Sequence, residues 1–184
     1  MKKYEILREY SIKVGNHTLY RPKALIDFGD VAAGELGGYI ESEKNLSHGG
    51  SCWIYKDSKV YEDAEISGHA KVISSEVHGH AEISKHAKVI SSTVYGNAKI
   101  SDRAEVKYST VCDNAKISDH AEVKSSKVCD NATVCDHAEL EDSITICDNA
   151  WVGGNATIRY NSTVGGNVRL GCNSVINDCS EVYD

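Results

Sequence analysis

Residues 111–123, VCDNAKISDHAEV, bring together the side chains that metal centres and nucleophilic sites use. Cys112, Asp113, Asp119 and His120 lie within nine residues of one another. Thiolates and imidazoles bind transition metals, and an imidazole beside a thiol can act as the base that activates it. The same residue types are frequent in tight turns. Which chemistry is open to them therefore depends on the elements that position them.

A three-residue motif, in which a small and an aliphatic residue flank any third residue, recurs along most of the chain. It has 23 copies between Cys52 and Val182. Successive aliphatic positions lie 6, 6 and 5 residues apart from Ile66 to Leu140, and every later step is 6. Three copies therefore form a unit of 17 residues in the first part of the repeat and of 18 residues in the second. Such a period indicates one structural unit stacked on copies of itself.

Each copy of the motif has the alternation of a short strand, and the polar residues between copies are typical of turns. A helix is excluded, because a six-residue step places successive aliphatic side chains ~240° apart and forms no apolar stripe. The pattern predicts an all-β fold, a parallel solenoid with three flat faces. With about 4.8 Å between stacked strands, the solenoid is expected to be a prism roughly 35 to 40 Å long.

The repeats resemble those of the hexapeptide-repeat, left-handed parallel β-helix superfamily, also called bacterial transferase hexapeptide proteins. The similarity covers about 130 of the 184 residues. It implies a triangular left-handed coil, and the repeat itself gives about seven to eight turns with 17 to 18 residues in each. The handedness rests on the resemblance alone, because ordinary crossover connections are right-handed. The 17-residue turns are shorter than the usual 18, which predicts one tighter corner in the first four or five turns.

Residues 1–50 lack the repeat and are expected to form a small N-terminal β cap, followed by the solenoid of residues 51–184. A solenoid leaves an open core and unpaired strand edges at its ends, and terminal units must cover them. The cap is expected to contain a hairpin with strands near residues 9–14 and 18–26, followed by a glycine-rich loop. The segments GELGGYIESEKNLS and GGSCWIY also resemble the head of a group of bacterial and phage hexapeptide-repeat proteins without a known activity.

Stacking the turns places residues one period apart above one another. Two corner columns consist mainly of Asn, Asp and His: Asp63, His80, Asn97, Asn114, Asn131, Asn149 and Asn167 in the first, and His69, His86, Arg103, His120, His137, Asn155 and Asn173 in the second. These residue types tolerate the left-handed backbone conformation, and asparagine side chains can bond one another in ladders. Repeated corner geometry is the simplest explanation of both columns.

Two pairs of histidines in the second column could carry chemistry. His69 lies one turn from His86, and His120 lies one turn from His137, at an expected spacing of ~5 Å. Each pair could share a metal ion, so these four residues are the candidate metal ligands, although their spacing is not diagnostic of one metal. For catalysis, His120 and His137 are the first candidates for a base and His80 is the next.

Cysteines and aspartates form further columns at the corners. Cys112, Cys129 and Cys147 are expected to be free thiols in a reducing compartment, with a redox-sensitive stack as the alternative. Two lines of aspartates are either solvated turn residues or surfaces for a cation or a basic partner. The candidate interface residues are these aspartates, the aromatic Trp151 and two cap residues: Asp113, Asp130, Asp148, Asp102, Asp119, Asp136, Trp151, Tyr20 and Arg21.

Composition and charge limit the function further. The formal net charge of −7 argues against direct binding to nucleic acid or to an anionic membrane surface. No run of 18 apolar residues occurs, and the first ten residues carry charges where a signal peptide would be apolar, so a cytoplasmic location is expected. Seven cysteines without a C-x-x-C pair indicate neither a disulfide framework nor a zinc knuckle, and no cofactor is expected.

Two classes of function remain. The superfamily resemblance implies acyl-CoA-dependent acyltransferases, such as acetyltransferases, which are typically trimers with a histidine base and substrate clefts between subunits. Those enzymes usually carry a loop extruded from one turn and a helical C-terminal segment, and neither is evident in residues 52–182. The favoured prediction is a non-catalytic scaffold that binds a protein partner or assembles with itself, as a homotrimer or an end-to-end dimer. The phage-like head adds a narrower prediction, an inhibitor of a host enzyme.

Overall fold

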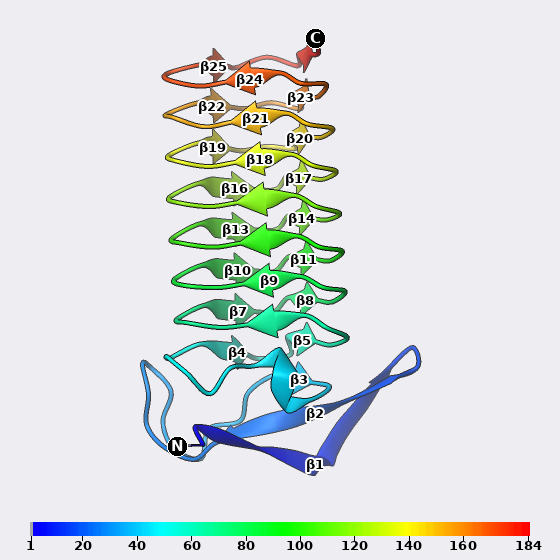
Figure 1. Cartoon of the computed structure of the whole chain (residues 1–184), viewed down its shortest axis with the longest axis vertical. Helices are drawn as coiled ribbons and strands as arrows, with labels where there is room; N and C mark the ends of the chain where they lie inside the picture. Colours follow the sequence, from blue (N-terminus) through cyan, green and yellow to red (C-terminus); the bar gives the residue numbers. More distant parts are fainter. Residues whose placement is uncertain (1) are drawn as a thin grey trace.

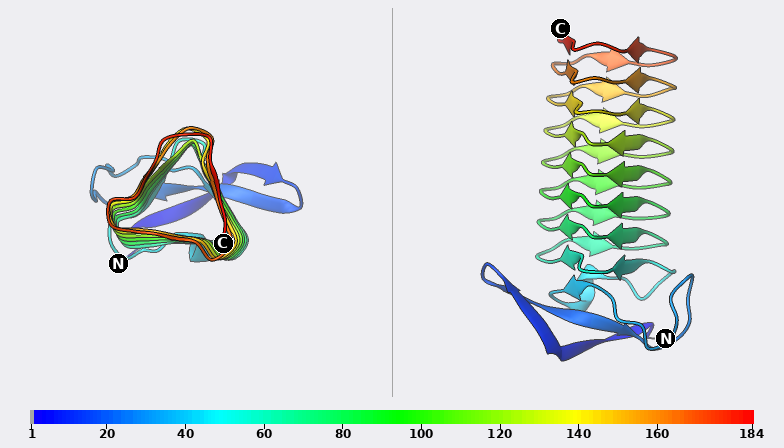
Figure 2. Two further views of the ribbon diagram at one scale, coloured as in Figure 1. Left: turned by 90° about the horizontal axis from the view of Figure 1, so that it is seen from above. Right: turned by 180° about the vertical axis from the view of Figure 1, so that it is seen from behind.

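Short β-strands joined by turns make up almost the whole of the computed structural model, which describes residues 2–184. The strands coil into a solenoid of about eight turns (Figure 1), which is triangular when seen along its axis (Figure 2). Within the described residues the sole helical element is a short 3-10 turn, η1 (Glu43–Asn45). The prediction of an all-β solenoid is therefore confirmed.

The chain visits the three sides of the prism in turn, so each side is a stack of strands from successive turns. The eleven-stranded sheet contains β1 (Tyr4–Val14), β2 (His17–Ala24), β3 (Tyr39–Ile40), β5 (Lys59–Val60), β8 (Glu76–Val77), β11 (Thr93–Val94), β14 (Thr110–Val111), β17 (Lys127–Val128), β20 (Thr145–Ile146), β23 (Thr163–Val164) and β26 (Glu181–Val182). The seven-stranded sheet contains β6 (Glu65–Ile66), β9 (Glu82–Ile83), β12 (Lys99–Ile100), β15 (Lys116–Ile117), β18 (Thr133–Val134), β21 (Trp151–Val152) and β24 (Arg169–Leu170). The eight-stranded sheet contains β4 (Trp53–Tyr55), β7 (Lys71–Ile73), β10 (Lys88–Ile90), β13 (Glu105–Lys107), β16 (Glu122–Lys124), β19 (Glu139–Leu140), β22 (Thr157–Ile158) and β25 (Val175–Ile176).

Strands of successive turns pair in parallel and in register, one period apart. Val89 of β10 lies between Val72 of β7 and Val106 of β13. In the seven-stranded sheet Ile100 lies beside Ile117. The residue columns expected from the repeat are therefore neighbours in space. In Figure 1 the nearer strands point to the left while the chain rises, which makes the coil left-handed, as the family resemblance implied.

Aliphatic and small side chains fill the axis of the solenoid. Ile83, Ile100 and Ile117 are fully buried above one another, and so are Ala87 and Ala104 at a corner. Burial of each large aliphatic side chain contributes about 1.5 to 3 kcal/mol relative to leaving it exposed. Each side chain packs mainly against the turns above and below it, so the stability of the core depends on unbroken stacking.

The first and second corners, which follow the eleven-stranded and the seven-stranded sheet respectively, turn at a different residue from the one expected. The Asn and His columns lie at the corners, as expected, but the left-handed conformation belongs to the residue before the Asn or His, such as Asp113 (φ 59°) and Asp119 (φ 61°). The physical reason is that Asn114 instead donates its N–H to the carbonyl of Asp130 one turn on, at 2.8 Å. The asparagine ladder is confirmed: Asn114 Nδ2 donates to Asn131 Oδ1 at 3.0 Å.

The third corner, which follows the eight-stranded sheet, is the tighter corner of the 17-residue turns. In those turns a single residue of this corner has positive φ, as at Ser91 (49°) and Ser125 (50°). In an 18-residue turn two consecutive residues do, as at Asp142 and Ser143 (both 67°). The one-residue difference in period is therefore absorbed at this corner.

A column of buried serines satisfies the backbone behind the third corner. Ser109 Oγ donates to the carbonyl of Lys107 at 2.6 Å and accepts the N–H of Ser126, one turn on, at 3.1 Å. The same pair of bonds repeats at other turns of the column, because each hydroxyl both donates and accepts. These serines are small inward-facing residues in the repeat, and the structure shows that they also hold successive turns together.

Strands β1 and β2 form an antiparallel hairpin that crosses the N-terminal end of the solenoid (Figure 1). The turn lies at Gly15 and Asn16, between the two predicted strand positions, but β1 begins five residues earlier than predicted and β2 ends two residues earlier. Strand β3 pairs antiparallel with β2 and parallel with β5. The eleven-stranded sheet is therefore continuous from the hairpin into the solenoid.

Candidate functional site

The candidate histidine pairs lie where the repeat places them, with their rings stacked face to face. The ring centroids of His120 and His137 are 4.9 Å apart with an interplanar angle of 1°, and those of His69 and His86 are 4.7 Å apart at 12°. Imidazole lone pairs lie in the plane of the ring. Because the planes of each pair are nearly parallel, the ring nitrogens do not converge on one point between them. In this arrangement each pair offers one ligand, rather than two, to a given metal ion.

His80, the third candidate base, stands in the first corner column. Its Nδ1 lies 3.6 Å from Asp63 Oδ2, with both side chains largely exposed. The pKa of Asp63 is lowered mainly by the ammonium group of Lys44, with which it forms a hydrogen bond, and to a smaller extent by His80. An imidazole beside a carboxylate is a suitable arrangement for a base, and His80 is separated from the other histidine candidates by its place at a different corner.

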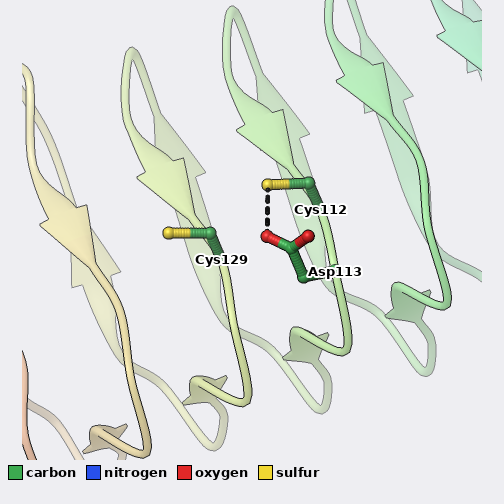
Figure 3. A group of neighbouring side chains, drawn as sticks. All are labelled: Cys112, Asp113 and Cys129. Atoms are coloured by element: carbon green, nitrogen blue, oxygen red, sulfur yellow. Dashed lines mark hydrogen bonds between the residues drawn. The ribbon is translucent and has the colours of Figure 1, made fainter.

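The cysteine column lies at the first corner, beside one of the aspartate lines (Figure 3). Cys112 and Cys129 are buried, and Cys112 Sγ donates to Asp113 Oδ2 at 3.1 Å. Burial and the adjacent Asp130 carboxylate raise the pKa of Cys129 to about 12, and burial also raises the pKa of Cys112. Both are therefore neutral thiols at pH 7 and weak nucleophiles. His120 belongs to the next corner, so the pair of thiol and base suggested by residues 111–123 does not form.

The two aspartate lines bond successive turns. In the first, Asp130 Oδ2 accepts the N–H of Asp148 at 3.2 Å, and Asp113 Oδ2 accepts that of Asp130 at 3.3 Å. In the second, Asp136 Oδ2 accepts the N–H of Gly154 at 2.8 Å. In the same line Asp119 Oδ2 accepts the N–H of Asp136 at 3.5 Å. The remaining member, Asp102, accepts a hydrogen bond from Lys85 Nζ at 2.6 Å through its Oδ1. One carboxylate oxygen of most of these residues is thus engaged with the backbone.

The remaining interface candidates have partners within the chain. The half-buried Trp151 ring covers the second corner. It lies so close to Gly153 that a Cβ added to this glycine would be 2.4 Å from the ring. The Arg21 guanidinium contacts Asp57 Oδ1 at 3.1 Å and lies over the Tyr39 ring. The guanidinium carbon of Arg8 lies over the Tyr20 ring, 5.5 Å from the ring centroid.

Two exposed tyrosines on the third corner are absent from the sequence-based candidates. Tyr108 is 62% exposed and Tyr160 is 51% exposed, and both have left-handed backbone conformations, at φ 51° and 63°. Beside Tyr108 is a shallow groove of about 260 Å³, lined by Thr110, Lys127 and Thr145 among others. Tyr108 takes the place that serine has in neighbouring 17-residue turns. This break in the repeat is the feature of the sequence that indicates an unusual residue at this corner. We call Tyr108 and Tyr160 the tyrosine ridge.

The repeat, the three stacked parallel sheets and the asparagine ladder fit the hexapeptide-repeat β-helix superfamily. No family profile matches the chain. Over 50 residues, 27% of this chain, the sequence is 42% identical to a protein of Escherichia coli (strain K12) named uncharacterized acetyltransferase YdcK. The match spans 15% of the length of that relative. Between residues 2 and 184, no helix is long and apolar enough to cross a membrane.

Proposed function

We propose that the protein is a non-catalytic scaffold whose third corner binds a protein surface. The observation that supports this function is the tyrosine ridge, Tyr108 and Tyr160, which stands on a rigid solenoid. The two residues are three turns apart, which corresponds to about 14 Å along the axis. Tyrosine is enriched at protein interfaces and among the residues that contribute most to binding energy.

The backbone conformation strengthens the case for the ridge. A bulky residue at positive φ is strained, typically by 1 kcal/mol or more, while glycine and asparagine tolerate this region better. The chain places tyrosine there at two turns and leaves both rings exposed, with no compensating burial. Strained residues tend to cluster at functional sites. Positive φ recurs at this corner in neighbouring turns, as at Ser91 and Ser125, so what a role in recognition accounts for is the choice of an exposed tyrosine at this position.

The scaffold is tested by replacing both ridge tyrosines with serine, the residue that occupies this position at Ser91 and Ser125. We expect Tyr108→Ser/Tyr160→Ser to fold with unchanged or slightly higher stability and to bind its partner at least about tenfold more weakly. Self-association is measured by size-exclusion chromatography with light scattering, and binding to other proteins by pull-down from a bacterial lysate. The matched control is Tyr10→Ser, which removes an exposed tyrosine from β1.

The readout separates the outcomes. A stoichiometric complex, either with a second copy or with another protein, that is lost in the double variant and kept in Tyr10→Ser supports the proposal. A complex that both variants retain equally contradicts it, and so does a wild-type protein that stays monomeric and retains no partner. A homotrimer or an end-to-end dimer would be visible directly in the mass from light scattering.

The name of the E. coli relative favours a second candidate function, acetyl transfer from acetyl-CoA. For this function His120 or His137 would act as the base, with His80 as the further candidate. The expected result is acetyl-CoA turnover by an oligomer, abolished in the alanine variant of the active histidine. Asn155→Ala, in the same column as His120 and His137, is the matched control. Turnover that survives all three histidine variants would contradict these assignments.

The narrower role as an inhibitor of a host enzyme remains a prediction from the head of the sequence. It would make the partner in the pull-down a bacterial enzyme whose activity falls on binding. The activity of the captured enzyme, measured with the wild-type protein and with Tyr108→Ser/Tyr160→Ser, tests it.

A further inference from the structure

Two buried thiols and a carboxylate meet between consecutive turns at the first corner. Cys112 is 2% exposed and Cys129 is 6% exposed, and the ligand atoms of Cys112, Asp113 and Cys129 all lie within 4.8 Å of one another. Figure 3 shows the Cys112 sulfur beside the Asp113 carboxylate, with both cysteine side chains pointing the same way along the stack. Thiolates with a carboxylate are ligands that zinc uses in proteins.

We propose that Cys112, Cys129 and Asp113 form a binding site for one thiophilic divalent cation of the zinc type. The cation would lie between the turn that carries Cys112 and the turn that carries Cys129. It would link the two turns in addition to their backbone hydrogen bonds. This site is independent of the tyrosine ridge, which lies at a different corner.

The distances match a tetrahedral site after a small adjustment. With metal–sulfur bonds of 2.3 Å and metal–oxygen bonds of ~2.0 Å, ligand atoms at tetrahedral angles are about 3.8 Å apart for two sulfurs and about 3.5 Å apart for sulfur and oxygen. Cys112 Sγ and Asp113 Oδ2 are already 3.1 Å apart. This pair needs to separate slightly, while Cys129 Sγ, now within 4.8 Å of both atoms, needs to approach them by up to about 1.3 Å, which rotation of the Cys129 side chain can supply.

A fourth ligand is available one turn on. Asp130 Oδ2 lies 3.4 Å from Cys129 Sγ and belongs to the same aspartate line as Asp113. This carboxylate, or a water molecule, would complete four-coordination. The ligands therefore come from equivalent positions of two successive turns, Cys112 and Asp113 in one and Cys129 and Asp130 in the next, rather than from one local motif.

Two other groups of the same kind occur along the corners, and they are weaker candidates. Asp119, Cys135 and Asp136 form one, and Asp130, Cys147 and Asp148 form the other. Each has one thiol and two carboxylates, and their cysteines are only partly buried. The Cys112 and Cys129 site has two thiols in a more buried place, which favours zinc over harder cations such as calcium.

Binding is coupled to proton release. The cation binds the two thiolates and the Asp113 carboxylate, so each ion bound releases two thiol protons to solvent. The ionisable groups that influence the pKa of the two thiols are the Tyr95 hydroxyl, the carboxylates of Asp113 and Asp130, and the Lys127 ammonium. The carboxylates become partners of the cation when it binds, and their negative charge then stabilises the loaded site.

The test uses Co²⁺ added to the reduced full-length protein, because the visible and ultraviolet absorption of Co²⁺ reports tetrahedral geometry and sulfur ligation. We expect one Co²⁺ per chain with two sulfur ligands, displaced by Zn²⁺, and two protons released per ion in calorimetry across buffers. Zn²⁺ should also raise the thermal unfolding midpoint of the wild-type protein.

Cys112→Ser and Cys129→Ser should each weaken Co²⁺ binding by at least about 100-fold, because even outer-shell changes often reduce affinity 10- to 100-fold. Asp113→Asn keeps a residue that tolerates positive φ and should weaken binding by about tenfold while the protein stays folded by circular dichroism. The exposed Cys172→Ser is the matched control and should bind like wild type. A wild-type protein without sulfur-ligated Co²⁺, or Co²⁺ binding unchanged in Cys112→Ser and Cys129→Ser, would overturn the proposal.

Discussion

Trp53→Ala is expected to lower the free energy of unfolding by about 3 to 5 kcal/mol, the range for removing a large buried aromatic side chain. Trp53 is fully buried in β4, at the junction between the N-terminal hairpin and the solenoid. Its ring packs edge-on against Phe28, with centroids 5.3 Å apart, and against Tyr4 at 6.1 Å. Alanine would leave a cavity among Phe28, Tyr4 and the first turn of the solenoid, where the hairpin packs on the solenoid core.

Two variants give this prediction its controls. Trp53→Phe should lower the free energy of unfolding by less than about 1.5 kcal/mol. It keeps most of the ring and removes an indole N–H that has no hydrogen-bond partner among the described residues. Trp151→Ala removes the half-buried tryptophan of β21 and should lower the free energy of unfolding clearly less than Trp53→Ala does. Urea unfolding followed by circular dichroism measures all three. Equal losses for Trp53→Ala and Trp151→Ala would show that the junction contributes little to stability.

The architecture of the solenoid follows from the spacing of its aliphatic residues. Because Ile100 and Ile117 are separated by one period, both the strand positions and the vertical pairing could be predicted without a structure. The same arithmetic separated Cys112 from His120 by one corner and placed His120 over His137, as observed. A repeat fixes register, because a slip of one residue would turn the core side chains outward.

The details of the corners could not be predicted in the same way. The repeat shows that Asp113 and Asn114 share a corner, but not which of the two takes positive φ, since both residue types tolerate that region. The stacking of the His120 and His137 rings depends on side-chain torsions that spacing does not define. These torsions decide that the histidines do not converge on a shared ion.

The candidate sites differ in how far the sequence reveals them. The cation site follows from the cysteine column, because Cys112 and Cys129 are one period apart. Their burial and the direction of the Asp113 carboxylate required the structure. The tyrosine ridge is a departure from the repeat, since Tyr108 replaces a serine. In a repeat protein, conformity to the pattern indicates the fold, and a departure from it is where a function of its own is best sought.

Ile117→Ala is expected to lower the free energy of unfolding by about 2 to 5 kcal/mol. Ile117 of β15 is fully buried at the middle of the solenoid, between Ile100 and Val134 of the adjacent turns. Each turn of a solenoid contacts only its neighbours, so stability is the sum of the turns and the interfaces between them. A cavity at a central turn weakens two interfaces at once. The unfolding transition should therefore become broader as well as shift to lower urea.

The matched variant is Leu170→Ala, in the same column of the seven-stranded sheet. Leu170 of β24 is only half-buried, because β24 is the last strand of its sheet. Its replacement should lower the free energy of unfolding by less than about half as much as Ile117→Ala, since part of the side chain is already in contact with water. Hydrogen exchange should show reduced protection on both sides of β15 in Ile117→Ala, and only in the last turns in Leu170→Ala. Equal losses of stability, or exchange that rises uniformly along the chain in both variants, would mean that the solenoid unfolds as one indivisible unit rather than as coupled turns.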